Sequence, residues 1–70
     1  MFYFFRRGHA WIRCEVRDAG GEGYDLVIDR PDATMQVEHF RGVDELNRRW
    51  AELQRSLQRE GWWGPQSRSG

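Results

Sequence analysis

The sequence contains no lysine, so all 11 of its basic residues are arginine, and 11 acidic residues balance them. The formal net charge is zero, which argues against broad attraction to nucleic acid or an anionic membrane but allows one basic face. The single cysteine, Cys14, excludes an internal disulfide and fits a reducing compartment. No apolar run approaches the roughly 18 to 20 residues of a membrane span. These absences predict a cytoplasmic protein with no membrane partner.

Metal ligands and catalytic groups are also scarce. The two histidines, His9 and His39, and Cys14 form no cluster with metal-ligand spacing. Cys14 alternates with apolar residues and is predicted to be a small buried side chain rather than a thiolate nucleophile. The three glycines of the segment 18–23 lack the phosphate-binding fingerprint and precede no helix. We therefore predict no catalytic residue, no metal site and no cofactor, and expect that the protein is not an enzyme.

Strand signals dominate the first 40 residues. The predicted strands are the segments 2–7, 10–17, 24–30 and 34–40, which are rich in strand-forming residues and separated by turn signals. Apolar and polar residues alternate along 10–17, as in a strand with one buried face. Gly8 and His9 between the first two strands suit a two-residue hairpin turn. In the fourth strand, Met35 and Val37 are expected to face the core.

From Val43 the apolar period becomes that of a helix. One apolar stripe is formed by Leu46, Trp50, Leu53 and Leu57. The pattern predicts an amphipathic helix of about 17 residues, with Gly42 at its N-cap. Gly61 suits the left-handed position after the helix, which would return Trp62 onto its last turn. One ring of the adjacent Trp62 and Trp63 is expected to remain partly exposed.

These elements predict an α+β fold of a 70-residue chain, which has room for one core. A four-stranded antiparallel β-meander is followed by one long C-terminal amphipathic α-helix packed on one face, in the order ββββα. We expect a single domain over residues 1–65 and a disordered tail over 66–70, since Gly64 and Pro65 stop the helix. The first and fourth strands would then be the edges of the sheet.

The face of the sheet that one helix cannot cover is expected to be aromatic and basic. The run from Phe2 to Phe5 must send two rings to each face. A two-residue turn at Gly8 puts Phe4 on the uncovered face with Trp11, and a turn longer by one residue reverses the faces. The predicted binding residues of this face are Phe4, Arg6, Trp11, Arg13 and Arg17, and the possible interface residues are Phe2 and Trp63.

Three interpretations of this face stay open. It could be a solvated surface held by cation–π contacts and ion pairs. It could be the interface of a homodimer or of a protein partner. It could also be a platform for single-stranded DNA or RNA, with bases stacked on rings and arginines along the phosphates. We expect a non-enzymatic binding module whose leading ligand is single-stranded nucleic acid, with a homodimeric or protein-protein interaction module as the alternative.

Two stretches resemble known families. The run FYFFRRGHAWIRCEVRDAGGEGYDLVIDRP, in the order ββββα, resembles one repeat of the PUR-type proteins, whose repeats pair into dimers and bind single-stranded nucleic acid. The stretch EHFRGVDELNRRWAELQRSLQREGWW is similar to the C-terminal half of a WGR domain, in which a strand leads into one long helix that closes on glycine plus an aromatic residue. The Trp-Gly-Arg signature of that family is absent. These resemblances imply a dimer and a nucleic-acid ligand.

Overall fold

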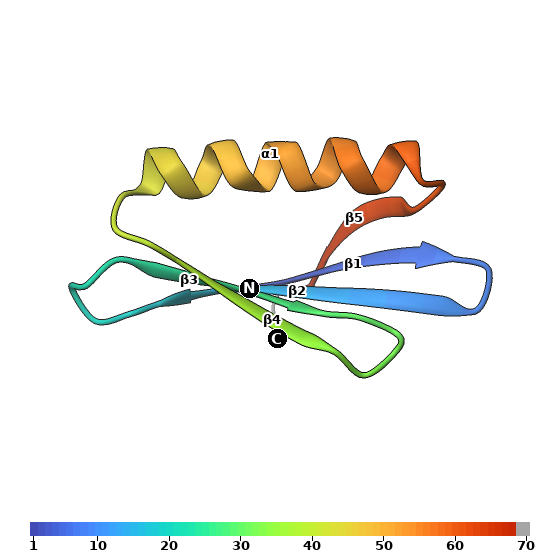
Figure 1. The fold of residues 1–70 in the computed structure, drawn as a ribbon, viewed down its shortest axis with the longest axis horizontal. Coiled ribbons are helices and arrows are strands. Elements are labelled where there is room, and N and C mark those ends of the chain that lie inside the picture. Colours follow the sequence, from blue (N-terminus) through green and yellow to red (C-terminus); the bar gives the residue numbers. More distant parts are fainter. Residues whose placement is uncertain (69–70) are drawn as a thin grey trace.

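A computed structural model of the protein describes residues 1–68, which form a five-stranded antiparallel sheet and one helix. The elements are β1 (Phe2–Arg7), β2 (Ala10–Asp18), β3 (Tyr24–Asp29), β4 (Met35–Phe40), α1 (Val43–Arg59) and β5 (Trp63–Arg68). The strand order in the sheet is β4-β3-β2-β1-β5. The helix α1 lies across one face of the sheet (Figure 1). The predicted α+β class and the order ββββα are confirmed, and a fifth strand follows the helix.

The first hairpin has the register that a two-residue turn produces. Phe5 pairs with Ile12, and Phe4 pairs with Arg13. The φ angle of Gly8 is 61°, a value that glycine adopts without steric cost at the first central position of a hairpin turn. Because opposite residues of an antiparallel pair share a face, Phe5 and Ile12 face α1. Phe4 and Arg13 lie on the other side, the open face of the sheet.

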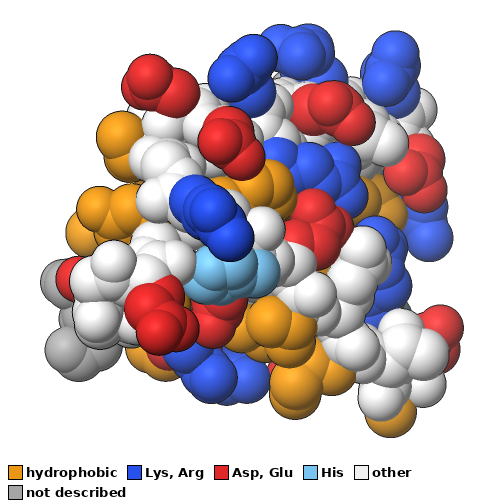
Figure 2. All heavy atoms as spheres, turned by 60° about the vertical axis from the view of Figure 1, so that its left-hand side comes forward, with side chains coloured by type: hydrophobic (Ala, Val, Ile, Leu, Met, Phe, Trp, Pro, Cys, Tyr) orange, Lys and Arg blue, Asp and Glu red, His pale blue; other side chains and the backbone are white. Residues whose placement is uncertain are grey.

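The outer surface of α1 is charged, and one of its arginines also fastens the helix to the sheet. Acidic and basic side chains alternate over α1 in Figure 2. Arg49 donates from Nε to Oε1 of Glu38 at 2.7 Å and from Nη2 to Oε2 at 3.0 Å. These hydrogen bonds hold the pKa of the Glu38 carboxyl below its ordinary value. The contact of α1 with β4 therefore includes a bidentate ion pair.

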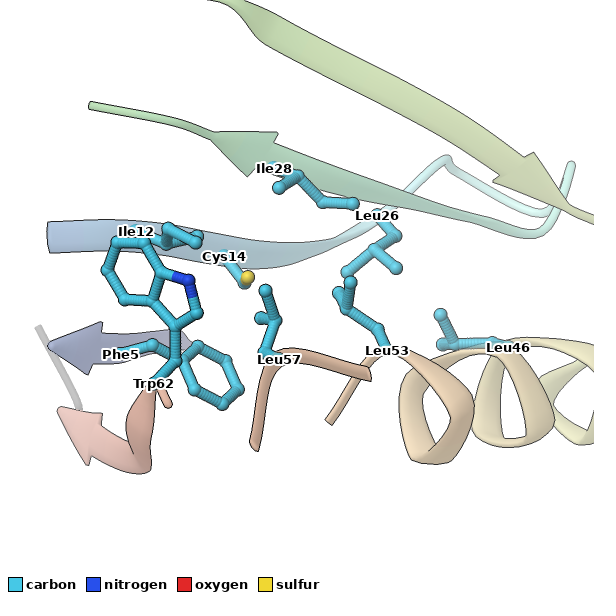
Figure 3. Close-up of a cluster of buried hydrophobic side chains, with 9 residues drawn as sticks. All are labelled: Phe5, Ile12, Cys14, Leu26, Ile28, Leu46, Leu53, Leu57 and Trp62. Atoms are coloured by element: carbon cyan, nitrogen blue, oxygen red, sulfur yellow. The ribbon is translucent and has the colours of Figure 1, made fainter. Parts of the chain in front are cut away.

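The apolar core lies between the sheet and α1. Its buried side chains, drawn in Figure 3, are Phe5, Ile12, Cys14, Leu26, Ile28, Leu46, Leu53, Leu57 and Trp62. Cys14 is fully buried, which confirms the predicted buried side chain, and this burial raises the pKa of its thiol to about 11. Trp50, predicted within the helical stripe, is only half-buried, with its ring 4.8 Å from that of Tyr3. It packs at the rim of the core rather than at its centre.

Trp62 closes the core at the C-terminal end of α1. Its backbone amide donates to the Leu57 carbonyl at 3.0 Å, and the Gly61 amide donates to the carbonyl three residues earlier at 3.1 Å. With Gly61 at a φ angle of 91°, these bonds form the predicted Schellman motif. Arg7 of β1 covers this helix end, because its Nη1 donates to the Glu60 carbonyl at 3.0 Å and its guanidinium carbon lies 4.6 Å from the centre of the Trp62 ring.

The strand β5 is the main departure from the predicted fold. It runs antiparallel to β1, with Phe4 opposite Gln66 and Phe2 opposite Arg68. The predicted disordered tail, 66–70, is therefore wrong as far as Arg68, because the backbone there pairs with β1, and its last two residues lie outside the described part of the chain. The domain accordingly extends beyond residue 65. The expectation that β1 is an edge is also wrong, since the outer strands are β4 and β5.

The strand β4 faces the opposite way from the prediction. Val37 pairs with Val27 and Met35 pairs with Asp29, which puts both side chains on the open face, where they are 58% and 61% exposed. Glu38 points toward α1 instead. The β3–β4 turn decides this orientation, because a change of one residue in strand register exchanges the two faces.

Candidate binding face

The open face gathers all five residues that the sequence analysis proposed for binding. On the first two strands, Phe4 lies opposite Arg13 and Arg6 lies opposite Trp11. Arg17 lies further along β2, opposite Asp25. The alternation of side chains along paired strands therefore places rings and guanidinium groups on one surface.

Arginine side chains lie over the rings of this face. The guanidinium carbon of Arg6 is 5.9 Å from the centre of the Trp11 ring, and that of Arg13 is 5.6 Å from the centre of the Phe2 ring. Phe4 and Trp11 meet edge to face, with ring centres 6.3 Å apart. Each exposed cation–π contact stabilises by about 0.5–1 kcal/mol. These contacts favour the observed arrangement of the rings and are weak enough for a ligand to displace.

Each acidic side chain on the open face has a basic neighbour. The pairs are Arg13–Asp29 at 3.2 Å, Arg17–Glu15 at 2.9 Å and His39–Asp25 at 2.7 Å. The hydrogen bond to Asp25 raises the pKa of His39. Within residues 1–68, Arg6 forms no ion pair, so the positive charge at the β1 end of the face is not neutralised by a direct contact.

An open hollow of about 500 Å³ lies among these residues. Its lining residues are Phe4, Trp11, Arg13, Asp29, Arg30 and Gln66. They come from the neighbouring strands β3, β2, β1 and β5 and from the turn after β3. Such a lining combines aromatic surface with guanidinium, carboxylate and amide groups. It suits a planar polar molecule that stacks on a ring and accepts or donates hydrogen bonds at its edges.

Three residues of the hollow were not among the predicted binding residues. Asp29 follows the alternation of Asp25 and Val27, which predicts it on this face as an ion-pair partner rather than as a binding residue. Arg30 ends the predicted strand 24–30, whose alternation puts it on the covered face, but β3 ends at Asp29 and Arg30 lies in the turn that follows. Gln66 belongs to β5 and was assigned to the tail.

The two possible interface residues differ in exposure. Trp63 is 69% exposed and lies opposite Arg6 at the outer strand β5. Phe2 is half-buried beneath the guanidinium of Arg13. Of the two, Trp63 has the larger fraction of its surface available to a partner.

No group of three or more histidine, cysteine, aspartate or glutamate residues within the described chain could hold a metal ion. In the same part of the chain, α1 is neither long nor apolar enough to traverse a bilayer.

Comparisons of the chain with protein-family models, with curated proteins and with solved structures find no match. The resemblances to PUR-type repeats and to WGR domains therefore stay predictions.

Proposed function

We propose that the protein is a small, non-enzymatic cytoplasmic module that binds single-stranded nucleic acid on its open face. The observation that carries the proposal is the position of Trp11, which is 46% exposed beside a hollow that also contains Arg13 and Arg30. A base that stacks on an exposed aromatic ring gains about 1–3 kcal/mol. Arginines on either side of such a ring are placed to contact the flanking phosphates.

The charge distribution favours modest affinity with a shallow salt dependence. The chain has no net charge, and Arg13 and Arg17 already have acidic neighbours on the face. Arg6 and Arg30 form no ion pair in the described chain and are the natural phosphate contacts. Two such contacts correspond to a slope of about −1.4 in log K against log salt, at about −0.7 per phosphate of a single strand.

The test is fluorescence anisotropy of a labelled single-stranded oligonucleotide at several salt concentrations. We expect Trp11→Ala to weaken binding by about 5-fold to 150-fold, as the loss of one stacked base requires. Arg6→Gln should lower both the affinity and the salt slope, whereas Arg55→Gln, a matched charge removal on the solvent side of α1, should change neither. Absence of binding at low salt, or equal effects of the two arginine changes, would exclude this function.

A second candidate function is a homodimeric or protein-protein interaction module. Exposed apolar side chains at both outer strands favour it: Met35 and Val37 on β4 are 61% and 58% exposed, and Trp63 on β5 is 69% exposed. Exposed apolar groups at sheet edges are typical of association sites. The solution mass tests the homodimeric form of this candidate, because a self-associating module exceeds the 8.4 kDa of one chain without any nucleic acid.

A further inference from the structure

The two outer strands of the sheet differ in how well they are protected against pairing with another chain. The strand β5 contains Gly64 and Pro65, and its register with β1 shifts between Phe4 and Arg6. Proline and irregular pairing at an edge both discourage the addition of another strand. The outer strand β5 is therefore a poor template.

The strand β4 has none of these protections. Its sequence, MQVEHF, contains no proline, glycine, lysine or arginine, and it pairs with β3 in an unbroken register from Met35 to Phe40. Its other side pairs with no strand within residues 1–68. The two ionisable side chains of β4, Glu38 and His39, are paired within the chain. This regular edge therefore presents a row of backbone donors and acceptors.

The side chains of β4 are also complementary to a second copy of the same strand. In an antiparallel pair centred on Val37, the Val37 side chains of the two chains meet, Gln36 lies opposite Glu38, and Met35 lies opposite His39. Opposite residues in such a pair interact directly, and like charges there would destabilise it. No like charges meet in this register. Gln36 Nε2 donates to Glu38 Oε2 within one chain at 2.8 Å, so pairing of the two chains exchanges this hydrogen bond for an equivalent one rather than adding one.

We infer that a second copy of this chain pairs with β4 in antiparallel register about Val37, which extends the sheet across the two molecules. The inference rests on the second candidate function, self-association, and assigns its interface. An axis of symmetry perpendicular to the sheet puts both open faces on one side and both helices on the other. Since Met35 and Val37 lie on the open face, the dimer covers part of their exposed surface with the same groups of the partner.

The first experiment measures mass by sedimentation over protein concentrations from about 10 µM to about 1 mM, because a short edge gives a weak interface. The wild-type mass should rise from 8.4 kDa toward twice that value. Val37→Asp brings two carboxylates face to face and should keep the protein monomeric throughout. Val43→Asp is the matched control, because Val43 is 50% exposed at the start of α1, and this variant should dimerise like the wild type.

The second experiment locates the interface without disturbing it. In Val37→Cys, the two thiols lie across the symmetry axis, where paired Cβ atoms are about 4.5–5.5 Å apart. A small approach of the two strands brings them within the roughly 3.5–4.5 Å of a disulfide, and diamide should oxidise them to a disulfide-linked dimer. Val43→Cys should cross-link at least tenfold more slowly, and Cys14 is buried and should not react. A dimer that survives Val37→Asp, or equal cross-linking of the two cysteine variants, would overturn this interface while leaving self-association intact. A protein that stays monomeric at the highest concentration would overturn both.

Discussion

Replacing Trp62 with alanine should remove most of the stability of the protein, whereas the same change at the adjacent Trp63 should leave it folded. Trp62 is 7% exposed and Trp63 is 69% exposed. Loss of a buried tryptophan side chain costs about 3–5 kcal/mol, and loss of the stacked Arg7 guanidinium adds about 0.5–1 kcal/mol. A chain of 70 residues has a total free energy of unfolding of roughly 3.5–10 kcal/mol. A loss of about 3.5–6 kcal/mol is the larger part of a mid-range total, so the Trp62 variant should be far less stable than the wild type.

The assay is urea denaturation followed by far-ultraviolet circular dichroism, whose main signal comes from the backbone rather than from the altered fluorophore. Trp63→Ala should change the free energy of unfolding by no more than about 0.5 kcal/mol, which is a shift of about 4 °C or less in the thermal midpoint. Trp62→Phe keeps an apolar ring in the core and should fall between the two alanine variants. Equal losses from the two alanine changes would refute the argument that the Schellman turn selects Trp62 alone for burial.

Three further predictions concern the helix end, β5 and His39. Gly61→Val should lower the free energy of unfolding by more than about 1 kcal/mol, measured in urea, because the φ angle of 91° is unfavourable for a β-branched residue. Gly64→Ala should lower the thermal midpoint, because the added Cβ would lie 2.6 Å from the Phe4 carbonyl oxygen, and an unchanged midpoint would contradict the pairing of β5 with β1. The pKa of His39 is raised, so its ion pair with Asp25 stabilises the fold at pH values below the pKa that His39 has in the unfolded state. This contribution disappears as the pH rises through the pKa that His39 has in the folded state. Asp25→Asn should lower the pKa of His39 in an NMR titration, and an unchanged value would show that Asp25 does not set it.

The first hairpin and the helix could be predicted because their signals are local. The Gly8 turn and the alternation around Ile12 together set the register of β1 and β2. The leucine spacing and Gly61 define the length and end of α1. Each of these features depends on residues within a few positions of one another, so no knowledge of distant parts of the chain is needed.

The strand β5 could not be predicted because its own sequence does not favour a strand. The segment WGPQSR contains Gly64 and Pro65 and lacks apolar alternation, all of which indicate a loop. It becomes a strand because Trp62 returns the chain onto the sheet beside the unpaired side of β1. The pairing therefore depends on tertiary position rather than on local propensity.

In the candidate face, too, some features could be predicted from local sequence and others depend on the tertiary structure. The alternation of β1 and β2 correctly placed the rings of Phe4 and Trp11 together with three arginines. The hollow also needs Gln66, which reaches the face only because β5 exists. The orientation of Val37 was wrong because β4 is set by the length of the preceding turn and by the attachment of Glu38 to Arg49, neither of which apolar spacing reveals.

The pairing of β1 with β5 determines how the protein responds to mechanical force. Phe2 lies opposite Arg68, so the chain leaves the antiparallel pair from both strands at the same end. The hydrogen bonds of such a pair run perpendicular to the strands. Tension applied at the chain ends therefore loads these hydrogen bonds one after another and peels the strands apart. It does not shear all of the hydrogen bonds at once. In an optical trap, the protein should therefore yield at low force, with β5 detaching before α1 and exposing the Trp62 side of the core.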